Sequence, residues 1–192
     1  MRSSTQSRKT RETDITLTLQ LDGGEVDVHT GIGFFDHMLT AFATHGGFGL
    51  VLRAEGDLHV DCHHTIEDTG IVLGKAFAEA LGSKAGIARF GSFYVPMDEA
   101  LAFCSVDISG RPYVFFQAEF AEERIGEYDT CMTEEFVRAF ATNAGLTLHT
   151  RLEYGKNSHH CVEAIYKAIA HAMRLAAARS QSGEVLSTKG VL

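Results

Sequence analysis

The sequence predicts an α+β fold, a two-layer sandwich built from two duplicated half-domains, each a mainly antiparallel sheet with helices on one face. Three observations lead to this prediction. Two stretches of the chain match each other in order, short segments alternate apolar and polar residues, and other segments repeat apolar residues at helical spacing. The chain has 192 residues, 45% of them hydrophobic, so a sizeable core can be buried.

The internal match indicates a duplication. Residues 41–45 (AFATH) return 98 positions later as residues 139–143 (AFATN), and three further identities follow at the same offset. Residues 63–67 (HHTIE) return 96 positions later as residues 159–163 (HHCVE), so the intervening loop is two residues shorter in the second copy. A period this long is typical of a duplicated domain rather than a solenoid. The expected units are half-domains at residues 10–88 and 89–180, followed by a C-terminal tail at residues 181–192.

Local patterns predict the elements of the first half. Apolar residues alternate with polar ones over residues 15–21, which indicates a half-buried strand. The Asp-Gly-Gly sequence at residues 22–24 predicts a hairpin turn into a second strand at residues 25–30. A helix, a strand and a second helix that ends near Gly82 are expected at residues 34–44, 50–54 and 67–81.

The second half shows the same kinds of pattern. Apolar residues from Val162 to Ala176 recur with a period near 3.6, which predicts a final amphipathic helix. Two strands are joined by a Ser-Gly-Arg-Pro turn at residues 109–112, and a helix and a third strand follow. The expected bounds are residues 100–108 and 113–120 for the first two strands, 133–142 for the helix and 146–151 for the third strand.

Composition limits the classes of function. The formal net charge of −8 argues against a nucleic-acid partner, which needs a basic face. No apolar run reaches a membrane span, and the polar residues 1–11 lack a secretory core, so we expect a cytoplasmic protein with a short mobile N-terminal arm. The four cysteines lack the close spacing of a zinc site and are interpreted as reduced, mostly buried thiols.

The chain has 10 histidines, including two adjacent pairs that are each followed by a glutamate. Residues i and i+4 lie on one face of a helix, so His63 and Glu67 can hold one ion, as can His159 and Glu163. The second histidine of each pair is turned by about 100° and should serve a different ion. Two metals are therefore predicted, each bound by a histidine and glutamate from one copy and by the outlying histidine of the other. These outlying histidines are His64 and His160.

The repeat adds one candidate ligand to each set, because His37 corresponds to Glu135 at the 98-residue offset. Mixed imidazole and carboxylate ligands suit Mn, Fe, Co or Zn rather than Ca or Mg. The ligands can come from one subunit or from neighbouring subunits, and the sequence leaves both alternatives open. The two predicted sets are His37, His64, His159 and Glu163, and Glu135, His160, His63 and Glu67.

Two histidines have no histidine counterpart in the other copy. His149 corresponds to Val51 on an expected strand, so we interpret it as a residue that packs or supports a ligand. His45 corresponds to Asn143 and can either contact a substrate or have a structural role.

Seven motifs stand in order along nearly the whole chain. They are residues 33–39 (GFFDHML), 61–68 (DCHHTIED), 89–91 (RFG), 96–100 (PMDEA), 107–113 (DISGRPY), 155–160 (GKNSHH) and 187–192 (STKGVL). Together they resemble the motifs of the imidazoleglycerol-phosphate dehydratase family.

The resemblance implies a hydro-lyase of histidine biosynthesis that converts D-erythro-imidazole glycerol phosphate to imidazole acetol phosphate. It also implies two Mn(II) ions per active site, no organic cofactor, and homo-oligomeric 24-subunit shells with active sites between subunits. The family's first ion uses the residues that match His37, His64, His159 and Glu163, in agreement with the repeat. Its second uses those that match His63, Glu67 and His160, and many members carry a histidine where this chain has Glu135.

The resemblance further implies a substrate-contacting acid at Glu12 and a phosphate pocket. Arginine offers forked donors to phosphate oxygens and lysine a compact charge, so the residue types suit this role. The residues that match the family's phosphate pocket are Arg89, Arg111, Lys167, Ser187 and Lys189.

For the mechanism, we hypothesise that metal ions stabilise the substrate ring as an imidazolate, because the hydrogen removed is not acidic and no carbonyl can hold the charge. Loss of the neighbouring hydroxyl as water then needs a proton donor. The candidate acids and bases are Glu163, Glu67, Glu12 and His45, and the sequence leaves their assignment open.

Two other functions stay possible from sequence alone. A two-metal hydrolase or phosphatase also uses paired ions, and an ion separation of about 3.5–4 Å would favour it. A non-enzymatic, metal-binding shell protein would keep its assembly and its metal without any dehydratase activity.

Overall fold

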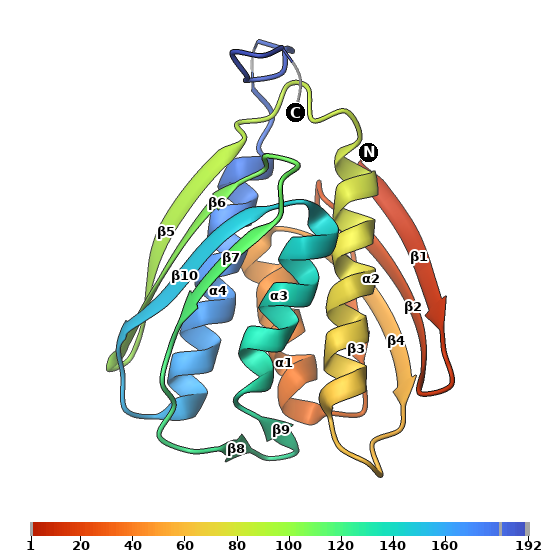
Figure 1. Ribbon diagram of the computed structural model, residues 1–192, viewed down its shortest axis with the longest axis vertical. Coiled ribbons are helices and arrows are strands. Elements are labelled where there is room, and N and C mark those ends of the chain that lie inside the picture. Colours follow the sequence, from red (N-terminus) through yellow and green to blue (C-terminus); the bar gives the residue numbers. More distant parts are fainter. Residues whose placement is uncertain (1, 181, 191–192) are drawn as a thin grey trace.

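The computed structural model describes residues 2–180 and 182–190, so residues 181, 191 and 192 of the expected tail lie outside the described part. Two four-stranded sheets form the outer layers of the molecule, and the helices lie between them (Figure 1). Each half therefore has one sheet covered by helices on its inner face, as the sequence predicted.

The first half forms a mixed sheet with the strand order β1-β2-β4-β3. Neighbouring strands are antiparallel except for β3 and β4, which run parallel. The elements are β1 (Ser3–Lys9), β2 (Thr13–Gln20), β3 (Val26–His29), α1 (Gly33–Gly46), β4 (Gly49–Gly56) and α2 (His63–Leu81).

The second half repeats this topology, with the strand order β5-β6-β10-β7 and a single parallel pair between β7 and β10. An additional two-stranded ribbon, β8 and β9, precedes the helix α3. The elements are β5 (Phe90–Met97), β6 (Ala100–Asp107), β7 (Tyr113–Gln117), β8 (Arg124–Ile125), β9 (Tyr128–Asp129), α3 (Met132–Ala144), β10 (Thr147–Tyr154) and α4 (Ser158–Ala177).

The helices α1 and α3 end in the same way, which supports the duplication at the level of backbone geometry. Gly47 and Gly145 follow the two helices in the left-handed conformation, each with φ of 68°. This conformation is unfavourable for residues with a Cβ atom. The next residues, Phe48 and Leu146, then donate backbone hydrogen bonds of 2.8 and 2.9 Å back into the last turn of their helices.

The predicted hairpin at residues 22–24 is wrong. The strand β3 does follow this turn, but β4 lies between β2 and β3, and β3 pairs with β4 in parallel. The helix α1 forms the crossover that a parallel pair requires. The strands β6 and β7 are separated by β10 in the same way.

The predicted mobile arm is also wrong, because β1 forms an edge strand over Ser3–Lys9. Its residues are polar and give little apolar alternation, so the sequence carried no strand signal there. Side-chain bonds to α2 hold it instead, including Ser4 Oγ to Glu79 at 2.6 Å and Arg8 to Asp68 at 2.8 Å. The strand β5 was likewise not predicted.

The helices of the two halves meet in pairs, α1 with α4 and α2 with α3 (Figure 1). The interface between the halves is a buried core that includes Phe35, Phe77, Phe136 and Phe140. Within the described residues, no helix combines the length and apolar character that crossing a membrane requires. All four cysteines are free, and Cys131 alone among them is exposed.

Candidate metal centre

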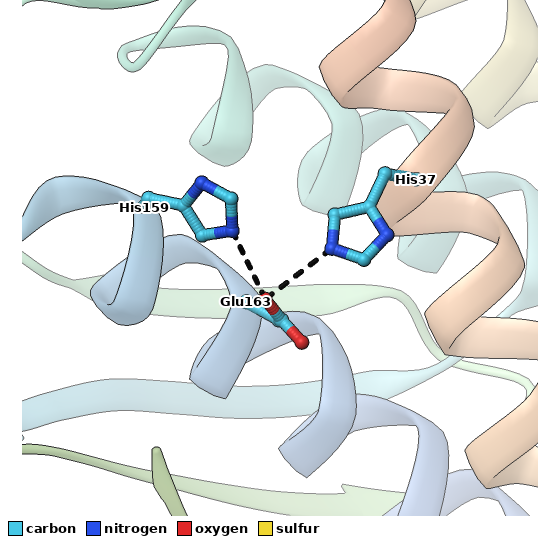
Figure 2. A group of neighbouring side chains, drawn as sticks. All are labelled: His37, His159 and Glu163. Carbon is cyan, nitrogen blue, oxygen red and sulfur yellow. Dashed lines mark hydrogen bonds and ion pairs between the residues drawn. The ribbon is translucent and has the colours of Figure 1, made fainter. Parts of the chain in front are cut away.

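Three predicted ligands come together where α1 faces the start of α4. The Nε2 atoms of His37 and His159 lie 3.4 and 3.2 Å from the same carboxylate oxygen of Glu163, and Figure 2 shows both rings directed at it. One potential ligand atom from each residue lies within 4.8 Å of the others. Two imidazoles and one carboxylate match the donors that bind Zn or first-row transition metals.

Local structure explains this convergence. His159 and Glu163 are four residues apart in the first turns of α4, so they lie on one face of the helix. The Phe34 ring packs edge-on against His159 with ring centroids 4.9 Å apart. The Glu163 side chain is only 7% exposed, whereas those of His37 and His159 are 49% and 43% exposed. The carboxylate is therefore the buried member of the group, and the two imidazoles are accessible to solvent.

A lysine holds the buried carboxylate in its ionised form. Lys167, one turn further along α4, places its Nζ atom 2.6 Å from Glu163 Oε1. Burial acts to raise the pKa of Glu163, but the Lys167 ammonium and the His37 ring outweigh it, so the pKa lies below its ordinary value. An ionised carboxylate is the form that binds a cation.

The outlying histidine of the first half is not a member of this group and faces two acids of its own half. His64 Nδ1 lies 3.0 Å from a carboxylate oxygen of Asp57, and its Nε2 lies 3.9 Å from Glu12. The hydrogen bond to Asp57 is the main reason that the pKa of His64 is raised, and Glu12 adds to it.

The outlying histidine of the second half has matching surroundings. His160 Nδ1 lies 2.8 Å from Glu99 Oε2, and its Nε2 lies 3.5 Å from Asp98. The bond to Glu99 raises the pKa of His160. Backbone N–H donors, chiefly that of Asn157, together with His160 lower the pKa of Glu99 to about 2.

The residues of the second predicted ligand set do not lie as close together. His63 Nε2 and Glu67 Oε2 are 3.8 Å apart at the start of α2, and both side chains are 45% exposed. Glu135 is half-buried on the facing helix α3. Among the described residues, the cluster of His37, His159 and Glu163 is the single metal-type group, so this second set does not form one within a subunit.

Four of the five predicted phosphate residues line one pocket of about 680 Å³. The Arg89 side chain is anchored there by Asp107 at 2.6 Å and by the Leu186 carbonyl at 2.6 Å. Lys167 is not part of this pocket, because it lies beside Glu163. The four residues in the pocket are Arg89, Arg111, Ser187 and Lys189.

The pocket and the ligand cluster lie at opposite ends of α4. The Arg89 N–H donates to the carbonyl of Ala176, in the last turn of the helix, whereas His159 is in the first turn. At 1.5 Å per residue these positions are about 25 Å apart. A small phosphorylated imidazole is too short to reach from the pocket to the ligand cluster of the same subunit.

The two unduplicated histidines have different surroundings. His45 lies near the ligand cluster, with its ring centroid 5.3 Å from that of His171. Burial is the main cause of its lowered pKa, and the Lys167 ammonium adds to the effect. His149 is exposed on β10 and stacks on Phe115 at 5.6 Å, so it packs between aromatic side chains of the second sheet.

Three acids that face the histidine pairs were not predicted from the sequence, namely Asp57, Asp98 and Glu99. Asp98 and Glu99 form the turn between β5 and β6, as Glu12 lies in the turn between β1 and β2. Asp57 directly follows β4, and only the fold brings these acids to the histidines. The motif at residues 96–100 was the available signal for Asp98 and Glu99, and Asp57 lies in none of the seven motifs.

The comparisons with known proteins agree in one family. The family model described as imidazoleglycerol-phosphate dehydratase matches residues 30–173. Imidazoleglycerol-phosphate dehydratases of Bacillus cereus strain AH187 and Bacillus anthracis strain CDC 684 / NRRL 3495 are 57% identical over 194 residues, covering 100% of both chains.

Solved structures agree in fold. The crystal structure of imidazoleglycerol-phosphate dehydratase from Staphylococcus aureus superposes with a TM-score of 0.85 at 40% identity, covering 93% of this chain and 99% of that chain. The Pyrococcus furiosus enzyme, solved in complex with (S)-C348, gives 0.84 at 38% identity and covers 97% and 100%.

The fold and the site define a duplicated α+β protein with a histidine and glutamate group suited to a metal ion. With these matches, the chain belongs to the imidazoleglycerol-phosphate dehydratase family. It is a hydro-lyase of histidine biosynthesis.

Proposed function

We propose that the chain dehydrates imidazole glycerol phosphate to imidazole acetol phosphate at a centre that holds two Mn(II) ions and is completed by a neighbouring copy of the chain. The observation that carries the proposal is the convergence of His37, His159 and Glu163, which supplies one partial ligand set. The donor types fit Mn(II), because imidazole nitrogens and carboxylate oxygens are both accepted by it.

The proposed ligand sets follow the duplication. The duplicated units remain those at residues 10–88 and 89–180, and β1 extends the first of them. Bound Mn(II) would supply Lewis acidity toward an electron-rich imidazole ring. One ion would be held by His37, His159, Glu163 and His64, and the other by His63, Glu67, Glu135 and His160.

Two features favour a site shared between subunits. His64 is directed toward Asp57 and Glu12 of its own half and is not part of the ligand cluster. The phosphate pocket lies about 25 Å from His159 of that cluster along α4. A closed homo-oligomer can bring both into one site, and we propose the 24-subunit shell that the family resemblance implies, in the cytoplasm.

The residues of the chain have separable tasks in this proposal. Arg89 and Arg111, with Ser187 and Lys189 of the tail, hold the phosphate and thereby orient the diol. Lys167 keeps Glu163 ionised. The reaction transfers the ring-adjacent C–H proton to a base and delivers a proton to the departing hydroxyl, which leaves as water. The groups available for these transfers are Glu163, Glu67, Glu12 and His45.

A reconstitution assay tests the proposal. The purified chain is stripped with a chelator, reloaded with Mn(II) and given imidazole glycerol phosphate, and the ketone product is followed. We expect turnover that depends on added metal. Full activity of the stripped protein, or absence of the ketone after reloading, would contradict the proposal. Release of inorganic phosphate would instead support a phosphatase, and an intact metal-loaded assembly without turnover would support a structural protein.

A further inference from the structure

Both outlying histidines are bound at Nδ1 by a carboxylate from their own chain. His64 Nδ1 lies 3.0 Å from Asp57, and His160 Nδ1 lies 2.8 Å from Glu99. The two acids do not occupy equivalent positions, because Asp57 follows β4 whereas Glu99 precedes β6. The two halves have therefore reached the same arrangement with different residues.

This arrangement determines which ring nitrogen can bind a metal. An ionised carboxylate only accepts hydrogen bonds, so the nitrogen that faces it carries the proton. His64 Nε2 lies 3.9 Å from Glu12, outside hydrogen-bond distance. His160 Nε2 lies 3.5 Å from Asp98, farther than its Nδ1 lies from Glu99. In a neutral imidazole Nε2 then keeps its lone pair. Carboxylates placed in this way commonly orient metal-binding histidines and raise their basicity.

We propose that Asp57 and Glu99 are positioning residues that hold His64 and His160 in the Nδ1–H tautomer, so that each Nε2 is presented to the metal ion of a neighbouring subunit. The inference rests on the proposed two-ion centre, and it assigns a role to two acids outside the ligand sets.

Glu99 is the more rigidly held of the two acids. Its Oε1 accepts hydrogen bonds from the backbone N–H groups of Lys156 and Asn157 at 3.1 and 2.8 Å, while Oε2 faces His160. In Asp57 both oxygens face His64 Nδ1, at 3.2 and 3.0 Å. An amide at residue 57 can therefore turn its oxygen toward the ring, whereas an amide at residue 99 cannot without losing two backbone bonds.

The variant Glu99→Gln separates the orienting role from the structural one. Its oxygen keeps the two backbone bonds, and its NH2 group replaces Oε2. This group donates to Nδ1, so the proton of His160 moves to Nε2 and blocks metal binding there. Glu122→Gln is the matched control, because Glu122 also accepts from a backbone N–H at the start of α4, that of Ser158 at 3.1 Å. Asp57→Asn should have the weaker effect, because its amide can turn.

The readout is Mn(II) binding to the full-length protein, followed by the paramagnetic resonance signal of free Mn(II). We expect Glu99→Gln to lower the affinity for one of the two Mn(II) ions about 10–100-fold and Glu122→Gln to leave both affinities unchanged. Nitrogen NMR of histidine-labelled metal-free protein should show one ring changing from Nδ1–H to Nε2–H. Wild-type affinity for both ions in Glu99→Gln, or equal weakening in both glutamine variants, would overturn the positioning role alone. Fewer than two ions in the wild type would overturn the two-ion centre itself.

Discussion

The helix pairs α1/α4 and α2/α3 are related by the duplication, and within the described part of the chain only the first forms a metal-type cluster. In α1/α4, His37, His159 and Glu163 place ligand atoms within 4.8 Å of one another. In α2/α3, His63 and Glu67 are 3.8 Å apart. The spacing of the ligands has been retained in both copies, while their surroundings have diverged.

The surroundings differ in charge and in packing. At the 96-residue offset, Lys167 of α4 corresponds to Ile71 of α2, so the α2/α3 pair has no lysine one turn after its glutamate. Two glycines of α2, Gly70 and Gly74, let α3 approach closely, since a Cβ atom on Gly74 would lie 2.5 Å from the Phe140 carbonyl oxygen. The α1/α4 pair thus differs by the lysine that pairs with its glutamate, and the α2/α3 pair differs by the glycines that allow close helix packing.

Removing the charge of Glu163 should have the largest effect on stability and metal binding of any change in the two helix pairs. Glu163→Gln loses a ligand and leaves the largely buried Lys167 unpaired, which costs about 3–5 kcal/mol of stability. Metal affinity should fall by more than the roughly 100-fold seen when only an outer partner is lost. Urea unfolding, metal content and turnover of the variant measure these effects. Wild-type metal content with normal turnover would exclude Glu163 as a ligand.

Substitutions at Glu135 should show whether the second helix pair contributes a ligand. Glu135→Ala should weaken the binding of one ion by at least the roughly 10–100-fold expected for loss of an outer partner. Glu135→His should restore binding, because imidazole is also a suitable donor. Calorimetric Mn(II) titration distinguishes the two variants. Equal affinity in Glu135→Ala and wild type would remove Glu135 from the ligand set.

Adding a methyl group at Gly74 tests whether α2 and α3 need a glycine at their contact. Gly74→Ala forces a Cβ atom against the backbone of α3 and should cost about 1–3 kcal/mol. The reverse change at the corresponding residue of α4, Ala170→Gly, should cost only about 0.5–1 kcal/mol from helix entropy. Thermal unfolding of both variants tests this order, and a larger loss in Ala170→Gly would contradict it.

The smallest effect concerns pH. Burial, aided by Lys167, lowers the pKa of His45, and burial with His45 itself does the same for His171. At these two histidines the unfolded chain therefore binds more protons below about pH 6.5, so their contribution to stability is complete above that pH and is lost as pH falls through the lower folded pKa. His45→Asn, which copies Asn143 of the other half, should flatten this dependence. Urea unfolding of metal-free protein between about pH 5 and 7.5 measures it; an unchanged slope would contradict the account.

Much of the fold was predictable because its signals are local. The alternation in β2, the helical period in α4 and the repeated histidine pairs all lie within short segments. The pairing of β3 with β4 was not predictable, because a turn sequence such as Asp22-Gly23-Gly24 does not specify which strand will lie alongside. The polar edge strand β1 gave no apolar signal, since hydrogen bonds to α2 hold it.

The candidate site also has a part that was predictable from local sequence and a part that was not. The i and i+4 spacing of His159 and Glu163 predicted a shared face, and the structure confirms their proximity. The acids that face His64 and His160 come from other segments, so the sequence could not assign them. The separation of the phosphate pocket from the ligand cluster also depends on which end of α4 each one occupies.

The central claim is that one of the two ions takes His64 from one subunit and Glu163 from another, and subunit complementation tests it most directly. His64→Ala and Glu163→Gln chains, each inactive alone, are coexpressed with different tags, and the mixed assemblies are purified. Turnover should recover to about one quarter of wild type, because one site in four then combines an intact His64 with an intact Glu163. Mixed assemblies as inactive as either parent would contradict the account.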